Sequence, residues 1–184
     1  MARCVAGAGQ RGHFPSEGGF EVFPMTVIAF TGSRPNKLGG YQLPNPTYLY
    51  VCQQIDKLLR ELQPDKVIVG GAQGVDSWAA MIAYKLKIPY LLAIPFEGQE
   101  LAWPEASQKT YRLQRKLATE EVIVSKGGYA AYKMQVRNCF MVDKCDKLIA
   151  IWDGSKGGTQ NCIEYAKSIG KEIIVIDPYG DKVA

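Results

Sequence analysis

The pattern of apolar and polar positions switches repeatedly between two kinds of segment along the chain. Short uncharged runs rich in β-branched residues, such as residues 67–69, are typical of buried strands. Between them, apolar residues recur every three or four positions, which is typical of amphipathic helices. The pattern predicts strands at residues 26–30, 66–69, 88–94, 121–124, 147–151 and 172–176. It predicts helices at residues 48–62, 75–87, 105–118, 132–144 and 159–169.

Strands that alternate with helices and are joined by short loops predict an α/β fold. Because each crossover helix returns the chain to the same edge, the central sheet should be mainly parallel, with helices on both faces. We therefore expect residues 25–184 to form a single domain, a Rossmann-like three-layer sandwich. In such sheets, ligands bind beyond the carboxyl ends of the strands, where the strand order reverses.

Three of the predicted strands end in glycine-containing turns, at residues 31–34, 70–76 and 153–159. The second and third turns lead directly into a predicted helix, whose first N–H groups have no partner inside the helix. Glycine lets the backbone approach a ligand closely, and the helix dipole favours an anion such as phosphate. If the three turns share one edge of the sheet, they form one nucleotide-sized pocket.

Side chains of these turns offer specific contacts, each with a structural alternative. Arg34 presents a planar fork for phosphate, or it is a solvated arginine in an ordinary turn. Asp76 could hold a ribose hydroxyl, although a structural role in the first helical turn is slightly favoured. Thr159 either adds a hydroxyl to a phosphate cradle or caps its helix. The candidate ligand-binding residues of the turns are Thr31, Gly32, Ser33, Arg34, Gly70, Gly71, Ala72, Gly74, Asp76, Gly157, Gly158 and Thr159.

Arg137 and Asn138 complete the set of candidates, in the helix before the fifth predicted strand. Arg137 either projects over the carboxyl edge toward phosphate or pairs with Asp143 or Asp146 at the surface. The loop aromatic residues that could stack on a base, or pack in the core or rim, are Tyr41, Trp103 and Tyr129. The carboxylates considered for acid–base work are Glu97, Glu105 and Glu164.

Composition narrows the classes of function. The chain has 184 residues with 47% hydrophobic and 22% charged residues, as ordinary globular domains have. The net charge of +4 is too small and dispersed to predict nucleic-acid binding, and no apolar run is long enough to cross a bilayer. His13 is the only histidine, so we predict no metal site and no cofactor. Five cysteines without a Cys-x-x-Cys pair favour reduced thiols in a cytoplasmic protein.

Residues 1–24 differ from the rest of the chain, since they are rich in glycine and lack periodicity. Met25 stands directly before the first predicted strand. We therefore expect the native protein to start at Met25 and residues 1–24 to be a disordered or non-native leader. The alternative is a genuine flexible N-terminal arm.

Four short motifs, taken together, resemble the SLOG superfamily, and within it the YpsA-related branch found in phages and bacteria. The motifs are Thr31-Gly-Ser-Arg-Pro, Gly70-Gly-Ala-Gln-Gly-Val-Asp-Ser-Trp-Ala-Ala, Arg137-Asn with Met141, and Asp153-Gly-Ser-Lys-Gly-Gly-Thr-Gln-Asn. The resemblance covers about residues 25–176. It implies a Rossmann-like fold that binds nucleotides or nucleotide-derived ligands.

The resemblance also bears on catalysis. Lonely Guy enzymes of this superfamily cleave the base from nucleoside monophosphates and carry Pro-Gly-Gly-x-Gly-Thr-x-x-Glu, with an arginine in the preceding helix that Arg137 could match. Here the extra glycine before Thr159 is missing, position 162 is Cys162, and Glu164 comes two residues late. The superfamily also includes DNA-processing protein A, which binds DNA, and sensor domains for ADP-ribose-type signals. The resemblance therefore favours phosphate binding over glycosidic hydrolysis.

The leading hypothesis is a sensor or sequestering module that binds a nucleotide-derived small molecule. The alternative is an N-glycosidase acting on nucleoside monophosphates or ADP-ribose-type compounds, with Glu164 or Asp153 assisting departure of the base. No membrane partner is expected, the modest charge argues against nucleic acid, and the resemblance allows a homodimer, which is common among the relatives.

Overall fold

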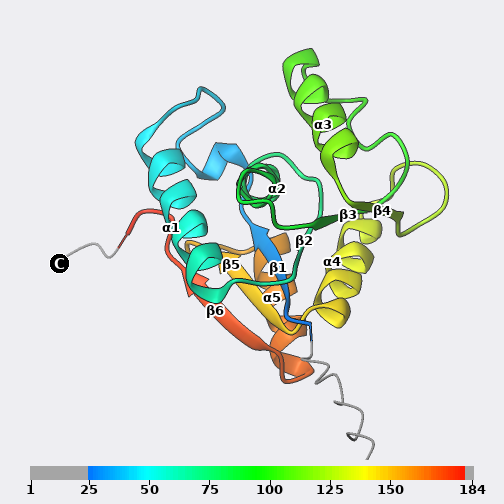
Figure 1. Cartoon of the computed structure of the whole chain (residues 1–184). Coiled ribbons are helices and arrows are strands. Elements are labelled where there is room, and N and C mark those ends of the chain that lie inside the picture. The colour runs from blue at the N-terminus through cyan, green and yellow to red at the C-terminus, as the bar shows by residue number, and fades with distance from the viewer. Residues whose placement is uncertain (1–24, 181–184) are drawn as a thin grey trace, which may run out of the picture.

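The computed structural model describes residues 25–180, which form one six-stranded sheet with helices on both faces (Figure 1). The strands are β1 (Val27–Gly32), β2 (Lys66–Val69), β3 (Tyr90–Ile94), β4 (Glu120–Ile123), β5 (Lys147–Ile151) and β6 (Glu172–Ile176). The helices are α1 (Pro46–Leu62), α2 (Val75–Lys85), α3 (Glu105–Leu117), α4 (Tyr132–Lys144) and α5 (Gly158–Ser168), and a 3-10 turn, η1 (Pro35–Lys37), follows β1.

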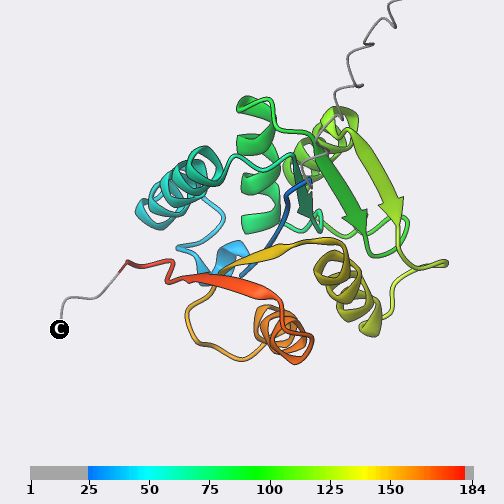
Figure 2. The ribbon, with the colours of Figure 1, turned by 60° about the horizontal axis from the view of Figure 1, so that its bottom comes forward.

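All neighbouring strands are parallel, in the order β4-β3-β2-β1-β5-β6. The order runs outward from β1 in one direction and then restarts at β5 on its other side. Helices α1, α2 and α3 lie on one face of the sheet, while α4 and α5 cover the other (Figure 2). The connections that leave β1 and β5 therefore go to opposite faces, which creates the switch point at which such sheets bind ligands.

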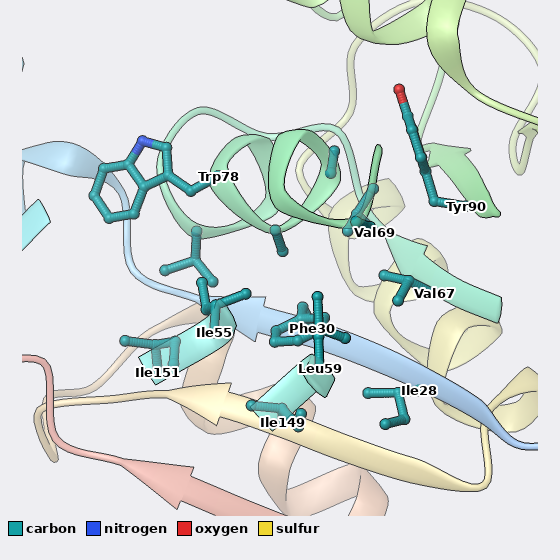
Figure 3. Packing of buried hydrophobic residues seen from close by; sticks show 14 of the residues in the cluster. Ile28, Phe30, Ile55, Leu59, Val67, Val69, Trp78, Tyr90, Ile149 and Ile151 are labelled. Carbon is teal, nitrogen blue, oxygen red and sulfur yellow. The ribbon is translucent and has the colours of Figure 1, made fainter. Parts of the chain in front are cut away.

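Successive residues of a strand point to opposite faces of the sheet, so each strand contributes to the core on both sides. Ile28 and Phe30 of β1 pack under α1 and α2, whereas Ala29 between them faces α4 and α5. Figure 3 shows the first half, where Ile55 and Leu59 of α1 lie against the sheet. The central strands are buried on both faces, which explains why their sequences are apolar apart from a lysine at the start of β2 and of β5.

The fold class predicted from the sequence is confirmed, and the sheet is entirely rather than mainly parallel. Four of the predicted elements, β2, α4, β5 and β6, have the predicted bounds, and the others begin or end one or two residues away. Leu49 and Leu113 fit the apolar periodicity that predicted their helices, but they are 58% and 46% exposed. Both lie in helices whose buried stripe is narrower than their run of apolar residues.

The leader expected at residues 1–24 lies outside the described residues, as does Cys4. Within residues 25–180, the cysteines are free, and no group of three or more metal-ligating side chains comes together. No helix in this part of the chain combines the length and the apolar character needed to cross a membrane.

Gly32, at the carboxyl end of β1, allows α2 to pack closely on the sheet. A Cβ atom added there would overlap the side chain of Val75 in the first turn of α2. We expect Gly32→Ala to lower the free energy of unfolding by about 1–3 kcal/mol, since overpacking forces a backbone shift. Urea denaturation would measure this loss. Gly128→Ala is the matched control, since nothing lies within 4 Å of a Cβ there.

Candidate functional site

A cavity of about 410 Å³ opens at the carboxyl ends of β1 and β5, where Gly32 and Ile151 are register partners. This is the switch point of the strand order. Segments far apart in sequence meet around the cavity. The lining residues are Thr31, Gly32, Ser33, Arg34, Asn36, Lys37, Ala72, Asp76, Met134, Arg137, Asn138, Ser155, Lys156, Gly157, Gly158 and Thr159.

The structure thus brings together most of the candidate ligand-binding residues. The first turn lines the cavity throughout, and so do the last five residues of the third turn. From the second turn only Ala72 and Asp76 reach it. Gly71 and Gly74 line a neighbouring cavity, and Gly70 lines neither.

The third turn presents the N-terminus of α5 to the cavity. Gly157 is the N-cap residue and therefore offers no capping side chain, while Thr159 lies within the first turn. The alternative in which Thr159 caps the helix is therefore wrong. The N–H groups at the start of α5 have no partner inside the helix, and the helix dipole makes this end positive. A Cβ built on Gly158 would have nothing within 4 Å, so the space beside these groups is open.

Arg137 and Asp76 form an ion pair beneath the cavity, with 3.3 Å between Nη1 and Oδ2. Their side chains are 8% and 7% exposed, unlike the more exposed ion pairs elsewhere in residues 25–180. Burial raises the pKa of the Asp76 carboxyl and lowers the pKa of Arg137, while the attraction between the two groups opposes both shifts. Asp76 also accepts a hydrogen bond from the Ala72 N–H at 3.1 Å, so the structural role that the sequence favoured is present.

Gly70 makes room for this ion pair and does not line the cavity. Arg137 Nη1 donates to the Gly70 carbonyl, and the guanidinium occupies the space that a side chain at Gly70 would fill. The surface alternative predicted for Arg137 is wrong. Asp143 instead accepts from the Tyr165 hydroxyl, and Asp146 accepts from the Val27 N–H.

Asn138 extends the network to the start of α5. Its Oδ1 accepts from Arg137 Nε at 3.0 Å, and its Nδ2 donates to the Gly158 carbonyl at 3.3 Å. Consecutive residues of α4 therefore tie the second glycine turn to the third. The network fixes the position of the α5 N-terminus relative to the rest of the sheet.

Lys37 is a cavity residue that the sequence reasoning missed. Its Nζ donates to Ser155 Oγ at 2.9 Å and to the Lys156 carbonyl at 3.2 Å. It therefore joins the first turn to the third. The signal was its position three residues after Arg34, in a turn that begins with Pro35, because a 3-10 turn brings residues at that spacing to one side.

The charges around the cavity favour an anion. Four basic side chains line it, and Asp76, held by Arg137, is the one carboxylate among the lining residues. The basic side chains are Arg34, Lys37, Arg137 and Lys156.

The two carboxylates predicted to be catalytic are not among the residues that line this cavity. Glu164 is exposed on α5 and accepts from Gln160 Nε2 at 2.6 Å. Asp153 accepts from the Ser155 N–H at 3.0 Å, and hydrogen bonding by Ser155 holds its pKa below the usual value. Cys162 stands where Lonely Guy enzymes carry glutamate, and burial raises its pKa to about 12, so its thiol stays protonated and a weak nucleophile.

The loop aromatic residues separate into two groups. Tyr41 and Trp103 line the neighbouring cavity, together with Gly71 and Gly74. Tyr129 packs edge-on against Phe96, with 5.8 Å between ring centroids, and lines neither cavity.

The parallel sheet and the cavity at its switch point define a Rossmann-like α/β protein. Comparison with known families narrows this class, because the model of the YspA SLOG family (YpsA) matches residues 28–178. The chain therefore belongs to the YspA SLOG family, as the motifs indicated.

Similar proteins include two from bacilli. The uncharacterized SPbeta prophage-derived protein YoqJ of Bacillus subtilis (strain 168) is 31% identical over 145 residues, covering 68% of this chain and 85% of YoqJ. A UPF0398 protein of Bacillus thuringiensis (strain Al Hakam) is 30% identical over 157 residues, covering 80% and 85%. These names state no activity.

Solved structures share the fold at low sequence identity. DNA processing protein A from Streptococcus pneumoniae superposes with a TM-score of 0.63 at 21% identity, over 86% of this chain and 52% of that one. The molybdenum cofactor binding protein from Rippkaea orientalis gives a TM-score of 0.53 at 17% identity, over 83% and 76%. At these identities the similarity establishes the fold alone.

Proposed function

We propose that the chain binds a phosphorylated, nucleotide-derived small molecule at the carboxyl edge of the sheet and acts as a sensor or sequestering module. The anionic group lies in the cavity between β1 and α5. One observation carries the proposal, namely that basic side chains and the uncapped N-terminus of α5 converge on one cavity at the switch point.

The residues have distinct roles in this proposal. The N–H groups of Gly158 and Thr159 bind phosphate oxygens, and Arg34 and Lys156 neutralise their charge from the cavity rim. Ser33 and Thr31 offer hydroxyls beside β1. Arg137 contributes charge and holds the turns in place, since two of its nitrogens already bond to protein groups.

Turnover has less support than binding. A glycosidase needs a carboxylate or another acid–base group beside the scissile bond. Among the lining residues only Asp76 carries a carboxyl, and it is paired with Arg137. The proposed catalytic roles of Glu164 and Asp153 would require the ligand to extend beyond the cavity.

Two structural neighbours are named for ligands of different kinds, DNA and a molybdenum cofactor. One fold can host many functions, so the choice for this chain rests on the cavity. A binder of single-stranded DNA would show a steep dependence of affinity on salt concentration. A small-molecule binder, in contrast, needs no binding surface beyond the cavity described above.

Arg34 is the cationic residue best placed to test the anion site, because no acceptor within residues 25–180 holds its guanidinium. We expect Arg34→Ala to weaken binding of pyrophosphate or of a nucleoside monophosphate by about 1.5–3 kcal/mol. Isothermal titration calorimetry would measure the change in Kd. Arg112→Ala on α3, outside both cavities, is the matched control. Equal affinities for wild type and Arg34→Ala would contradict the proposed site.

A panel of nucleoside monophosphates and ADP-ribose compounds separates the binder from the enzyme. A thermal shift without release of free base supports the sensor or sequestering role. Release of base in proportion to protein, and its loss in Glu164→Gln, would establish the hydrolase instead.

A further inference from the structure

We propose that the neighbouring cavity holds the planar ring of the ligand whose anionic part lies in the first cavity. The ligand is then a nucleoside phosphate rather than a sugar phosphate or inorganic phosphate. This inference rests on the proposed function, because the first cavity must bind the anion.

The second cavity has a volume of about 120 Å³ and adjoins the first along the turn between β2 and α2. Ala72 lines both cavities. On the far side of Ala72, Gly74 adopts a φ of +94° and a Cβ there would meet the Ser33 carbonyl at 2.7 Å. The turn therefore packs directly on the backbone after β1 at Gly74, and a ligand that occupies both cavities passes over the small side chain of Ala72.

Three aromatic residues that line the second cavity, Trp78, Trp103 and Tyr111, are held in place by their neighbours. Trp103 and Tyr111 form an edge-to-face pair with 5.4 Å between ring centroids, and Trp78 packs in the same way against Tyr48 at 5.1 Å. Gln99 Nε2 donates to the Tyr111 hydroxyl at 2.9 Å, which fixes that ring further. Held rings of this kind provide a preformed surface on which a planar ring can stack.

A buried polar group in the second cavity favours a ligand with hydrogen-bonding groups over a hydrocarbon. Gln73 is among the residues that line the cavity, and its Nε2 is buried without a hydrogen-bond partner among the described residues. Buried amide donors are nearly always paired in folded proteins. A ring with hydrogen-bond acceptors on its edge, as every nucleobase has, would supply the missing partner.

Two large apolar side chains at the entrance of the cavity are exposed, which folding alone does not explain. Tyr41 and Leu43 line the cavity although they are 56% and 48% exposed, on the loop before α1. Large apolar side chains held at the entrance of a pocket mark a binding surface. They would cover the outer face of a bound ring.

The test compares ribose 5-phosphate with AMP, GMP, CMP and UMP by calorimetry, in wild type and in Ser107→Leu. Ser107 lines the second cavity only, so leucine fills the ring site and leaves the anion site unchanged. We expect at least one nucleoside monophosphate to bind wild type about tenfold more tightly than ribose 5-phosphate. In Ser107→Leu this advantage should fall to about twofold or less, while the Kd of ribose 5-phosphate stays constant. Ala106→Leu, on the exposed face of α3, should retain the advantage.

The outcomes separate this inference from the proposed function. Equal affinity of wild type for all five compounds, or an advantage that survives Ser107→Leu, overturns the ring site while leaving the anion site standing. Absence of binding by all five compounds removes both. If Ser107→Leu does not fold, Trp152→Phe leaves Trp78 and Trp103, which both line the second cavity, as the only tryptophans. Quenching of their fluorescence by the nucleotide but not by ribose 5-phosphate supports the site, and no quenching by either contradicts it.

Discussion

Arg137→Met should lower the free energy of unfolding by about 3–5 kcal/mol, because it leaves the Asp76 carboxyl group buried without its partner, whether it stays charged or takes up a proton. Methionine has a similar length and adds no new charge. The Gly70 carbonyl loses its donor at the same time. Urea denaturation of the wild type and the variant at neutral pH would measure the loss, and a loss below about 1 kcal/mol would contradict the buried pair.

Two further variants separate charge from packing. Arg60→Met removes an arginine that pairs with Asp56 on the exposed face of α1, and it should leave stability almost unchanged. Adding Asp76→Asn to Arg137→Met should restore part of the lost stability. The amide of asparagine can accept from the Ala72 N–H, and it carries no charge that needs a partner.

The stability of Arg137→Met should also depend on pH in a defined direction. Burial raises the pKa of Asp76, and removal of Arg137 removes the main interaction that opposes this shift. The folded variant then holds a proton that the unfolded chain releases above a pKa of about 3.9. Its stability must therefore fall as pH rises. The difference from wild type should be larger at pH 8 than at pH 5, which denaturation at both values would show.

Arg137 also illustrates the limit of reasoning from sequence. Its position on a helix before β5 was predictable, since the periodicity of α4 gave the right bounds. Its partner, Asp76, lies 61 positions away, and the space that it occupies depends on the missing side chain of Gly70. No local pattern records such a contact. The sequence therefore identified a functional candidate but not the ion pair that positions it.

The glycine turns show a similar limit. The edge of the sheet at which they lie was predictable, but the cavity that each residue lines was not. Alternation of strands and helices placed all of them at the carboxyl edge, because parallel strands share their direction. Which side of the β2–α2 turn each residue faces depends on tertiary packing. Ala72 and Asp76 reach the first cavity, whereas Gly71 and Gly74 line the second. One predicted pocket is therefore two adjoining cavities.

Gly158→Asp should abolish anion binding without harming the fold. A side chain at Gly158 enters open space, and this residue does not adopt a positive φ. A carboxylate in the first turn of α5 interacts favourably with the helix dipole, so the melting temperature should stay constant or rise. The same carboxylate occupies the space proposed for the ligand phosphate and repels it. We expect the Kd for pyrophosphate to rise about 100-fold or more.

Gly158→Asn is the matched control, because asparagine has nearly the same size and shape as aspartate but no charge. If the N-terminus of α5 binds the anion, the neutral variant should lose much less affinity than the charged one. Equal losses would indicate that bulk rather than charge blocks the cavity. An unchanged Kd in Gly158→Asp would place the anion elsewhere, because a carboxylate beside bound pyrophosphate at this helix end must weaken its binding. Calorimetry at two salt concentrations strengthens the comparison, since screening reduces only the electrostatic part of the difference.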